Sequence, residues 1–181
     1  VVSTDSGVAA GYNGGTHAPI EDIAIMRVIP GMTVIEHTDS VMLKDLLKRA
    51  VDQYGMFYIR LTRRNAVKIY AEGSEFPIGG SAVVREGNDI TIFTSGLMVA
   101  EVLRLTKVLE MEGISAKVID LYSLKPLDQK AIIQSAKETQ AVVTVENHNV
   151  VAGLGDAVAS ILIEEHPVPM KKVGIQDSFL F

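Results

Sequence analysis

Two spacings of apolar residues alternate along this chain of 181 residues. Short, mostly apolar runs are typical of strands, and longer stretches with apolar residues every three or four positions are typical of helices. The first spacing predicts strands at 1–4, 32–36, 56–61, 81–85, 89–93, 116–121, 141–146 and 170–175. The second predicts helices at 20–29, 41–54, 97–111, 127–138 and 152–165. Strands that alternate with helices predict an α/β fold of mostly parallel sheets, with helices on both faces.

Local signals support the first two predicted helices. Pro19 suits the first turn of a helix, because its missing N–H would have no partner there. Glu21 and Asp22 complement the positive end of the helix dipole. Asp39 or Ser40 is expected to cap the next helix through a side-chain oxygen.

A stretch rich in glycine and polar residues divides the chain. Residues 66–80 predict a linker and turn. We therefore predict two successive three-layer αβα units, a first domain at 1–70 and a second at 71–181. In the second unit, the turn Glu86-Gly87-Asn88 predicts a hairpin between its two flanking strands, and hence an antiparallel edge strand.

Composition excludes several classes of protein. Apolar residues make up 48% and charged residues 22%, as in ordinary globular domains. A net charge of −5 with scattered basic residues argues against a nucleic-acid surface. The absence of cysteine excludes disulfides and cysteine-based zinc sites. No apolar run approaches the roughly 20 residues of a membrane span, and no signal-peptide pattern is present, so a cytoplasmic location is expected. Because the chain begins with Val1 and no methionine, we expect it to be part of something longer.

Candidate binding residues lie on two predicted loops. Ligands of open α/β sheets gather at the carboxyl ends of strands, which places loops 7–17 and 62–65 on one rim. Glycines in the first loop allow close approach to a ligand, and the imidazole of His17 can donate or accept a proton near neutral pH. Arg63 and Arg64 can bind phosphate oxygens through paired donors. The residues alone leave plainer alternatives open: His17 can be an ordinary polar residue of a loop, and Arg63 and Arg64 can belong to a solvated turn.

Other motifs point away from a metal or dinucleotide site. Gly153-Leu154-Gly155 lacks the third glycine of a dinucleotide fingerprint, so it predicts a tight turn before a helix. The four histidines lack metal-ligand spacing, and neither His37 nor His148 has a local partner pattern. No Gly-x-Ser-x-Gly elbow of a serine hydrolase occurs.

A set of motifs follows one order along nearly the whole chain. They are Thr16-His17-x-Pro19-Ile20-Glu21, Arg27-Val28-Ile29-Pro30-Gly31-Met32, Arg60-Leu61-Thr62-Arg63, Val84-Arg85-Glu86-Gly87, Thr94-Ser95-Gly96, Lys125-Pro126-Leu127-Asp128, Val145-Glu146-Asn147-His148 and Gly153-Leu154-Gly155. In this order and spacing they resemble the transketolase superfamily of thiamine-diphosphate enzymes. The resemblance implies the C-terminal portion of a pyrimidine-binding domain at 1–70, followed by a complete transketolase C-terminal domain at 71–181.

The resemblance also implies roles for three residues of the loops. His17 matches a family histidine near the aminopyrimidine of the cofactor and the substrate hydroxyls, which implies a catalytic and cofactor-binding role. Arg63 matches the arginine that binds the sugar phosphate, with Arg64 as the alternative.

Two positions depart from the family pattern. Asn13 stands where the family usually has an aspartate that binds a substrate hydroxyl. Thr4 stands where the family has a histidine, just before Asp5 in the predicted substrate site. An asparagine can still bind a hydroxyl but brings no charge, so the sugar contacts are expected to differ.

The activity implied is transfer of a two-carbon ketol unit from a ketose phosphate to an aldose phosphate, in pentose phosphate metabolism. In this family the glutamate that protonates the pyrimidine ring lies upstream of Val1. The diphosphate, with its Mg²⁺ or Ca²⁺ ion, lies on a separate N-terminal domain. We therefore expect this chain to be inactive alone, to work with an N-terminal subunit or domain, and to form a homodimer or heterotetramer, with no nucleic-acid or membrane partner.

Three alternatives remain. Two of them lie within the superfamily: a 1-deoxyxylulose-5-phosphate synthase and a beta-type subunit of a 2-oxoacid dehydrogenase. Pro19 and Leu61-Thr62-Arg63 favour transketolase over both. The third is a non-catalytic domain that provides dimer contacts.

Overall fold

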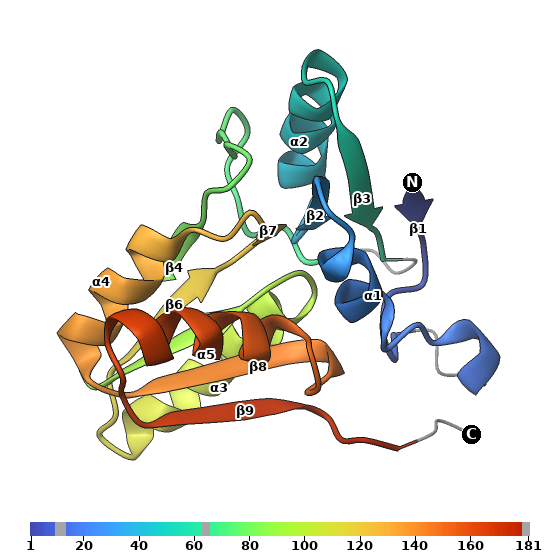
Figure 1. Cartoon of the computed structure of the whole chain (residues 1–181). Coiled ribbons are helices and arrows are strands. Elements are labelled where there is room, and N and C mark those ends of the chain that lie inside the picture. Colours follow the sequence, from blue (N-terminus) through green and yellow to red (C-terminus); the bar gives the residue numbers. More distant parts are fainter. Residues whose placement is uncertain (10–13, 63–65, 179–181) are drawn as a thin grey trace.

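The computed structural model describes residues 1–9, 14–62 and 66–178, and its elements alternate as the sequence predicts. The first part contains β1 (Val2–Ser3), the 3-10 helix η2 (Gly15–His17), α1 (Asp22–Val28), β2 (Met32–Glu36), α2 (Ser40–Asp52) and β3 (Met56–Arg60). The second part contains β4 (Ala82–Arg85), β5 (Ile90–Thr94), α3 (Met98–Met111), β6 (Ala116–Asp120), β7 (Ser123–Lys125), α4 (Gln129–Thr139), β8 (Val142–Asn149), α5 (Leu154–Glu165) and β9 (Met170–Ile175). The two parts stand side by side in Figure 1, with the first on the right.

The first sheet lies between α1 and α2. Its strand order is β1-β3-β2-β7 over the described residues, and β1, β3 and β2 are parallel. On one face Ile23 of α1 belongs to the same buried cluster as Val34 and Tyr58. On the other face Ile35 is buried with Leu46 of α2. Adjacent residues of β2 therefore point to opposite faces, each against its own helix.

The second sheet has helices on both faces in the same way. Its order is β4-β6-β5-β8-β9 over the described residues. Phe93 is buried with Ile132 of α4 and Val158 of α5, whereas Ile92 is buried with Val102 of α3. Both units are thus three-layer αβα arrangements with mostly parallel sheets, which confirms the predicted fold class.

The hairpin predicted around Gly87 is wrong. β4 pairs antiparallel with β6, not with β5, and β6 separates the two strands. The connecting residues cross the start of β6, where the N–H groups of Asn88 and Asp89 both donate to the carbonyl of Ser115. β6 is buried at every position, so it takes a central place between two neighbours. The predicted antiparallel edge strand is confirmed, but with a different partner.

A short strand from the second part completes the first sheet. β7, which periodicity did not predict, pairs antiparallel with β2. The Lys125 side chain donates to the carbonyls of Arg27 and Ile29, each at 2.7 Å. Leu121 and Leu124 are buried in one cluster with Ile23. The two parts therefore share a core, and the division at residue 70 remains a prediction about domains.

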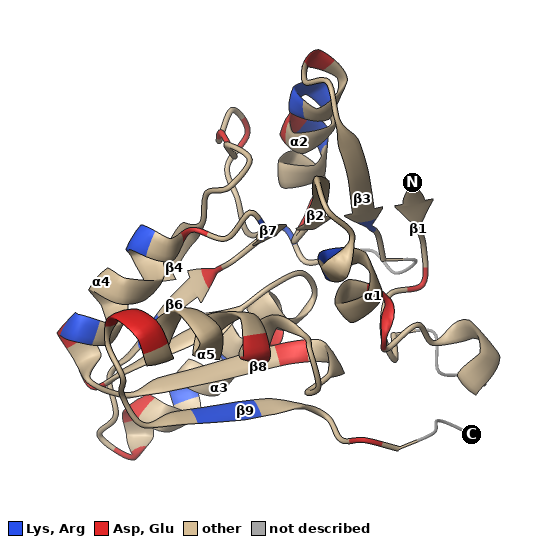
Figure 2. Cartoon of the chain, viewed as in Figure 1, with Lys and Arg blue, Asp and Glu red and all other residues tan. Residues whose placement is uncertain are grey.

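Charged residues are spread over the surface of both parts. Figure 2 shows Lys, Arg, Asp and Glu interspersed along the helices and strands, as the sequence suggested. Within the part of the chain that the structure describes, none of the helices is both long and apolar enough to cross a membrane.

Candidate functional site

The two candidate loops leave the same rim of the first sheet. β1 and β3 are parallel neighbours, so their carboxyl ends lie together. The N–H of Leu61 donates to the carbonyl of Ser3 at 2.7 Å, and the N–H of Ser6 donates to the carbonyl of Leu61 at 3.2 Å. The glycine-rich loop therefore starts beside the residues that lead to the arginine pair, as predicted.

The structure brings two of the predicted site residues together. Asp5 and His17 line one hollow of about 360 Å³ beside α1. The other residues of its wall are Thr4, Gly15, Thr16, Ala18, Pro19 and Glu21. His17 is exposed, and its Nδ1 lies 2.9 Å from the hydroxyl of Thr16.

Asp5 has a backbone conformation that is uncommon for residues other than glycine. Its φ of 64° lies in the left-handed region, which few residues other than glycine adopt, although aspartate and asparagine do so more often than most. Such conformations are concentrated at functional sites. Asn13, Arg63 and Arg64, the other predicted site residues, lie outside the described residues.

A buried arginine connects this rim to the second part of the chain. Arg60 ends β3 and is 1% exposed. Its guanidinium donates to Asp22 at 2.8 and 3.1 Å and to Glu36 at 2.6 Å. It also donates to the carbonyls of Pro19 and Asn147, each at 3.0 Å. One side chain thus holds the start of α1, the end of β2 and the end of β8.

The charges of this cluster stabilise one another. Burial alone lowers the pKa of Arg60, but the carboxylates of Glu36 and Asp22 outweigh burial, so the pKa is raised and the group stays charged. Glu36 also accepts a hydrogen bond from the hydroxyl of Ser95, at 2.6 Å, in the loop before α3. Asp22 accepts another from the hydroxyl of Tyr58, at 2.6 Å. The cluster joins the two parts of the chain through charged hydrogen bonds.

The turn Gly153-Leu154-Gly155 is a helix start whose amides are already occupied. The N–H groups of Leu154 and Gly155 donate to the carboxylate of Glu146, at 2.7 and 3.0 Å. This side chain therefore satisfies the first turn of α5 from the neighbouring strand. Burial raises the pKa of Glu146 to about 7, against the two backbone donors that lower it. The prediction of a tight turn, rather than a dinucleotide loop, is confirmed.

His37 and His148 are buried and have structural partners. Nδ1 of His37 lies 3.1 Å from the carbonyl of Arg60. Nδ1 of His148 lies 2.7 Å from the carbonyl of Asn149, so this nitrogen donates, and Nε2 accepts weakly from the N–H of Ala24. Burial lowers the pKa of His148, which agrees with a neutral ring. Among the described residues, no group of three His, Cys, Asp or Glu side chains is placed to hold a metal ion.

A second buried carboxyl group lies where the linker meets both parts of the chain. Asp120, at the end of β6, accepts hydrogen bonds from the hydroxyls of Thr38 at 2.5 Å and Tyr70 at 2.8 Å. Burial raises the pKa of Asp120 to about 7, and the nearby carboxylates of Glu36 and Asp39 act in the same direction. The two hydroxyl donors act in the opposite direction.

We expect Asp120 to make the protein less stable as pH rises from about 4 to about 7. In this window the folded state binds a proton at Asp120 that the unfolded state has lost, so the free energy of unfolding falls by up to about 1.4 kcal/mol per pH unit. Asp120→Asn removes this dependence. Denaturant unfolding of the unmodified protein and of Asp120→Asn at several pH values gives the free energy of unfolding as a function of pH. The carboxyl of Glu146 contributes equally to both curves. Parallel curves would contradict the prediction.

Local sequence patterns indicate the buried charge cluster only weakly. Arg60 and Glu36 are charged residues at the ends of otherwise apolar strands, which could have identified them as partners. Arg60 belongs to the motif Arg60-Leu61-Thr62-Arg63 and Glu36 to none of the motifs, and the sequence alone indicates no role for either. Asn147 lies just beyond the predicted end of its strand, and β8 in fact continues to Asn149.

Two family models match the chain in sequence order. The model described as "Transketolase, pyrimidine binding domain" matches residues 1–68. The model described as "Transketolase, C-terminal domain" matches residues 79–180.

Individual proteins match over nearly all of this chain. The 6-deoxy-6-sulfo-D-fructose transketolase subunit SqwH of Clostridium sp. (strain MSTE9) is 46% identical, over 99% of this chain and 56% of that protein. A putative transketolase C-terminal section of Methanocaldococcus jannaschii is 37% identical, over 99% of this chain and 57% of that protein. A solved structure, described as a split gene transketolase, inactive beta4 tetramer, has a TM-score of 0.91 and 42% identity, over 98% of this chain and 57% of that chain. The chain spans a little over half the length of each.

Proposed function

We propose, because this chain belongs to the transketolase family, that it is the C-terminal component of a thiamine-diphosphate-dependent transketolase. It transfers a two-carbon ketol unit between sugars that carry a terminal anionic group, together with an N-terminal diphosphate-binding subunit or domain. The observation that carries the proposal is the match of both family models, in order, to a chain that spans just over half of relatives described as transketolase subunits or sections.

The hollow beside α1 fits one side of a site for substrate and cofactor. Its wall combines an exposed imidazole at His17, a carboxyl group at Asp5 and hydroxyls at Thr4 and Thr16. These groups suit hydrogen bonds to sugar hydroxyls and to an aminopyrimidine. When bound, thiamine diphosphate supplies the carbanion chemistry, and the protein orients the substrate and excludes water.

We assign the remaining contacts as follows. Arg63 binds the anionic end of the sugar, with Arg64 as the alternative, and Asn13 binds a sugar hydroxyl. The diphosphate and its Mg²⁺ or Ca²⁺ ion are held by the N-terminal part. The name of the Clostridium relative, a 6-deoxy-6-sulfo-D-fructose transketolase subunit, supports including a sulfonate beside phosphate as the anionic group.

Reconstitution tests this proposal. The chain is co-expressed with the product of the neighbouring reading frame and assayed with thiamine diphosphate, Mg²⁺, an aldose phosphate acceptor, and either a ketose phosphate or 6-deoxy-6-sulfo-D-fructose as donor. We expect ketol transfer by the pair and none by either chain alone. Formation of 1-deoxyxylulose 5-phosphate in a parallel assay, in which pyruvate replaces the ketose donor and glyceraldehyde 3-phosphate is the acceptor, would instead favour the synthase alternative. A pair that transfers no ketol unit from either donor would remove the proposed function.

We expect His17→Ala to lower kcat/KM of the reconstituted enzyme by about 10- to 100-fold. Loss of one hydrogen bond to a polar or charged group has about this effect. His166→Gln is the matched control, because His166 follows α5 and does not line the hollow. Equal activity of His17→Ala and the unmodified protein would exclude a role for His17 in the site.

A further inference from the structure

We propose that Asn147, in β8 of the second part of the chain, is a positioning residue for the substrate side of the site. The inference rests on the proposed function. If Asn147 holds the loop that leads from Asp5, the C-terminal domain helps to shape the site and does more than provide dimer contacts.

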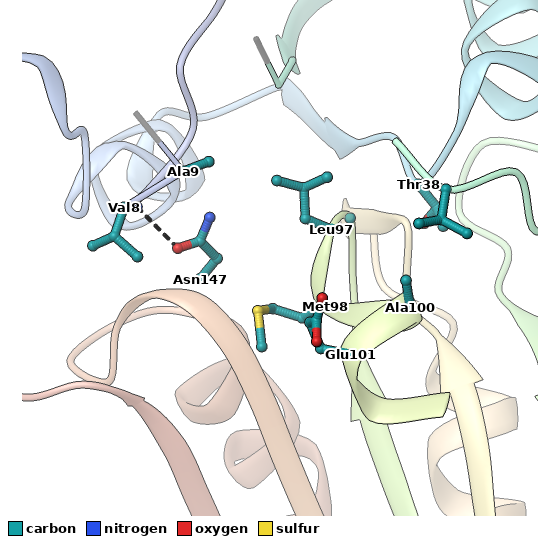
Figure 3. A pocket seen from close by; sticks show the side chains of 10 residues that line it. Val8, Ala9, Thr38, Leu97, Met98, Ala100, Glu101 and Asn147 are labelled. Atoms are coloured by element: carbon teal, nitrogen blue, oxygen red, sulfur yellow. Dashed lines mark hydrogen bonds between the residues drawn. The ribbon is translucent and has the colours of Figure 1, made fainter. Parts of the chain in front are cut away.

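The side chain of Asn147 forms two hydrogen bonds with the backbone of this loop. Its Oδ1 accepts from the N–H of Val8 at 3.0 Å, and its Nδ2 donates to the carbonyl of Ser6 at 3.0 Å. The amide thus binds the loop on both sides of Gly7, as a neighbouring strand would. Figure 3 shows the Asn147 side chain directed at the backbone of Val8.

Gly7 is in direct contact with the same side chain. Its φ is +58°, and a Cβ at this position would overlap the amide group of Asn147. Glycine is therefore required both for the left-handed conformation and for the close approach.

The loop and the His17 segment are held together at the same point. The N–H of Gly7 donates to the carbonyl of Pro19 at 3.0 Å, two residues after His17. Arg60 donates to that same carbonyl and also to the carbonyl of Asn147. Through Ser6 and Gly7, Asn147 is therefore connected to the segments that carry Asp5 and His17, two of the residues that line the hollow.

Packing alone does not determine the position of the loop. A cavity of about 260 Å³ lies between Val8 and Ala9 on one side and Leu97 and Met98 on the other, and Asn147 borders it. Figure 3 shows the loop and the start of α3 on opposite sides of this space. Because the cavity offers room to move, the hydrogen bonds of Asn147 are what hold Val8 in place.

The first experiment measures the loop without enzyme activity. Amide hydrogen exchange of Gly7 and Val8 is followed by NMR in the unmodified chain, in Asn147→Ala and in the control Asn149→Ala. Asn149 lies on the same strand with similar burial, but its side-chain oxygen accepts from Val151, next to its own position in the chain. We expect at least about tenfold faster exchange of Val8 in Asn147→Ala only. Equal exchange in all three proteins overturns the proposal, whatever the activity of the reconstituted enzyme.

The second experiment separates positioning from general stability. In the reconstituted enzyme, we expect Asn147→Ala to raise KM for the ketose donor about tenfold while kcat changes less than threefold. Asn147→Asp keeps the acceptor for Val8 but places an oxygen against the carbonyl of Ser6, so its KM should also rise. An unchanged KM overturns the proposal. If the unmodified pair transfers no ketol unit, the proposed function fails, and the exchange experiment still decides whether Asn147 holds the loop.

Discussion

Replacing Arg60 by methionine is expected to lower the free energy of unfolding by about 3–5 kcal/mol. The substitution removes the cation but leaves the carboxylates of Asp22 and Glu36 in a site that excludes water. It also removes the Arg60 donor from the carbonyls of Pro19 and Asn147, the first of which still accepts from the N–H of Gly7. A buried charge without its partner is costly because the interior replaces little of its hydration. Urea unfolding followed by circular dichroism gives the measurement.

A matched control variant separates the cost of breaking a buried ion pair from the cost of breaking an exposed one. Arg104 forms an exposed pair with Glu101 on α3, with both side chains more than half exposed. We expect Arg104→Met to cost less than about 1 kcal/mol, because water screens such pairs. The triple variant Arg60→Met, Asp22→Asn, Glu36→Gln should recover part of the lost free energy of unfolding, because it also removes the two unpaired carboxylates. Similar losses for the Arg60 and Arg104 variants would show that the cluster contributes little.

Replacing Gly87 by alanine is expected to destabilise the protein by about 3 kcal/mol. A Cβ at residue 87 would overlap the carbonyl carbon of Ala116 and the amide nitrogen of Lys117. These are backbone atoms of a central strand, so they cannot move aside as a flexible side chain could, and overpacking of this kind costs energy. The expected loss follows from the crossing of β6 by the connection between β4 and β5. Thermal or urea unfolding measures it.

The control for Gly87 is a glycine in open space. Gly113 follows α3 with φ of +77°, and a Cβ there would meet nothing within 4 Å. Asparagine tolerates this conformation, so Gly113→Asn should cost less than about 1 kcal/mol. A hairpin between β4 and β5 would leave residue 87 free, and Gly87→Ala would then behave like the control.

Local sequence patterns were sufficient to predict most of the helices and strands. The strands at 32–36 and 170–175 have the predicted ends. Asp39, one of the two expected caps, accepts from the N–H of Met42 at 2.9 Å. These features depend on residues within a few positions of one another, because apolar spacing reports which face of an element is buried and a cap bonds its own first turn.

The candidate site was predicted less completely. Periodicity placed loops 7–17 and 62–65 on one rim, since parallel strands align their carboxyl ends. The resemblance to a family was needed to choose His17 and Arg63 from the other polar loop residues. The roles of His17, Arg63, Arg64, Asn13 and Asp5 stay predictions that the experiments above address.

The sequence by itself determined most of the elements, the αβα class and the polar rim, because each follows from neighbouring residues and their spacing. Only the tertiary structure decided which strands pair, as with β4 beside β6. It also decided that Arg60 lies between partners 24, 38 and 87 positions away and that the amide of Asn147 reaches back to Val8. Spacing indicates that a face is buried but not what covers it. Buried polar groups need specific partners, and here the folded chain supplies them from positions far apart in sequence.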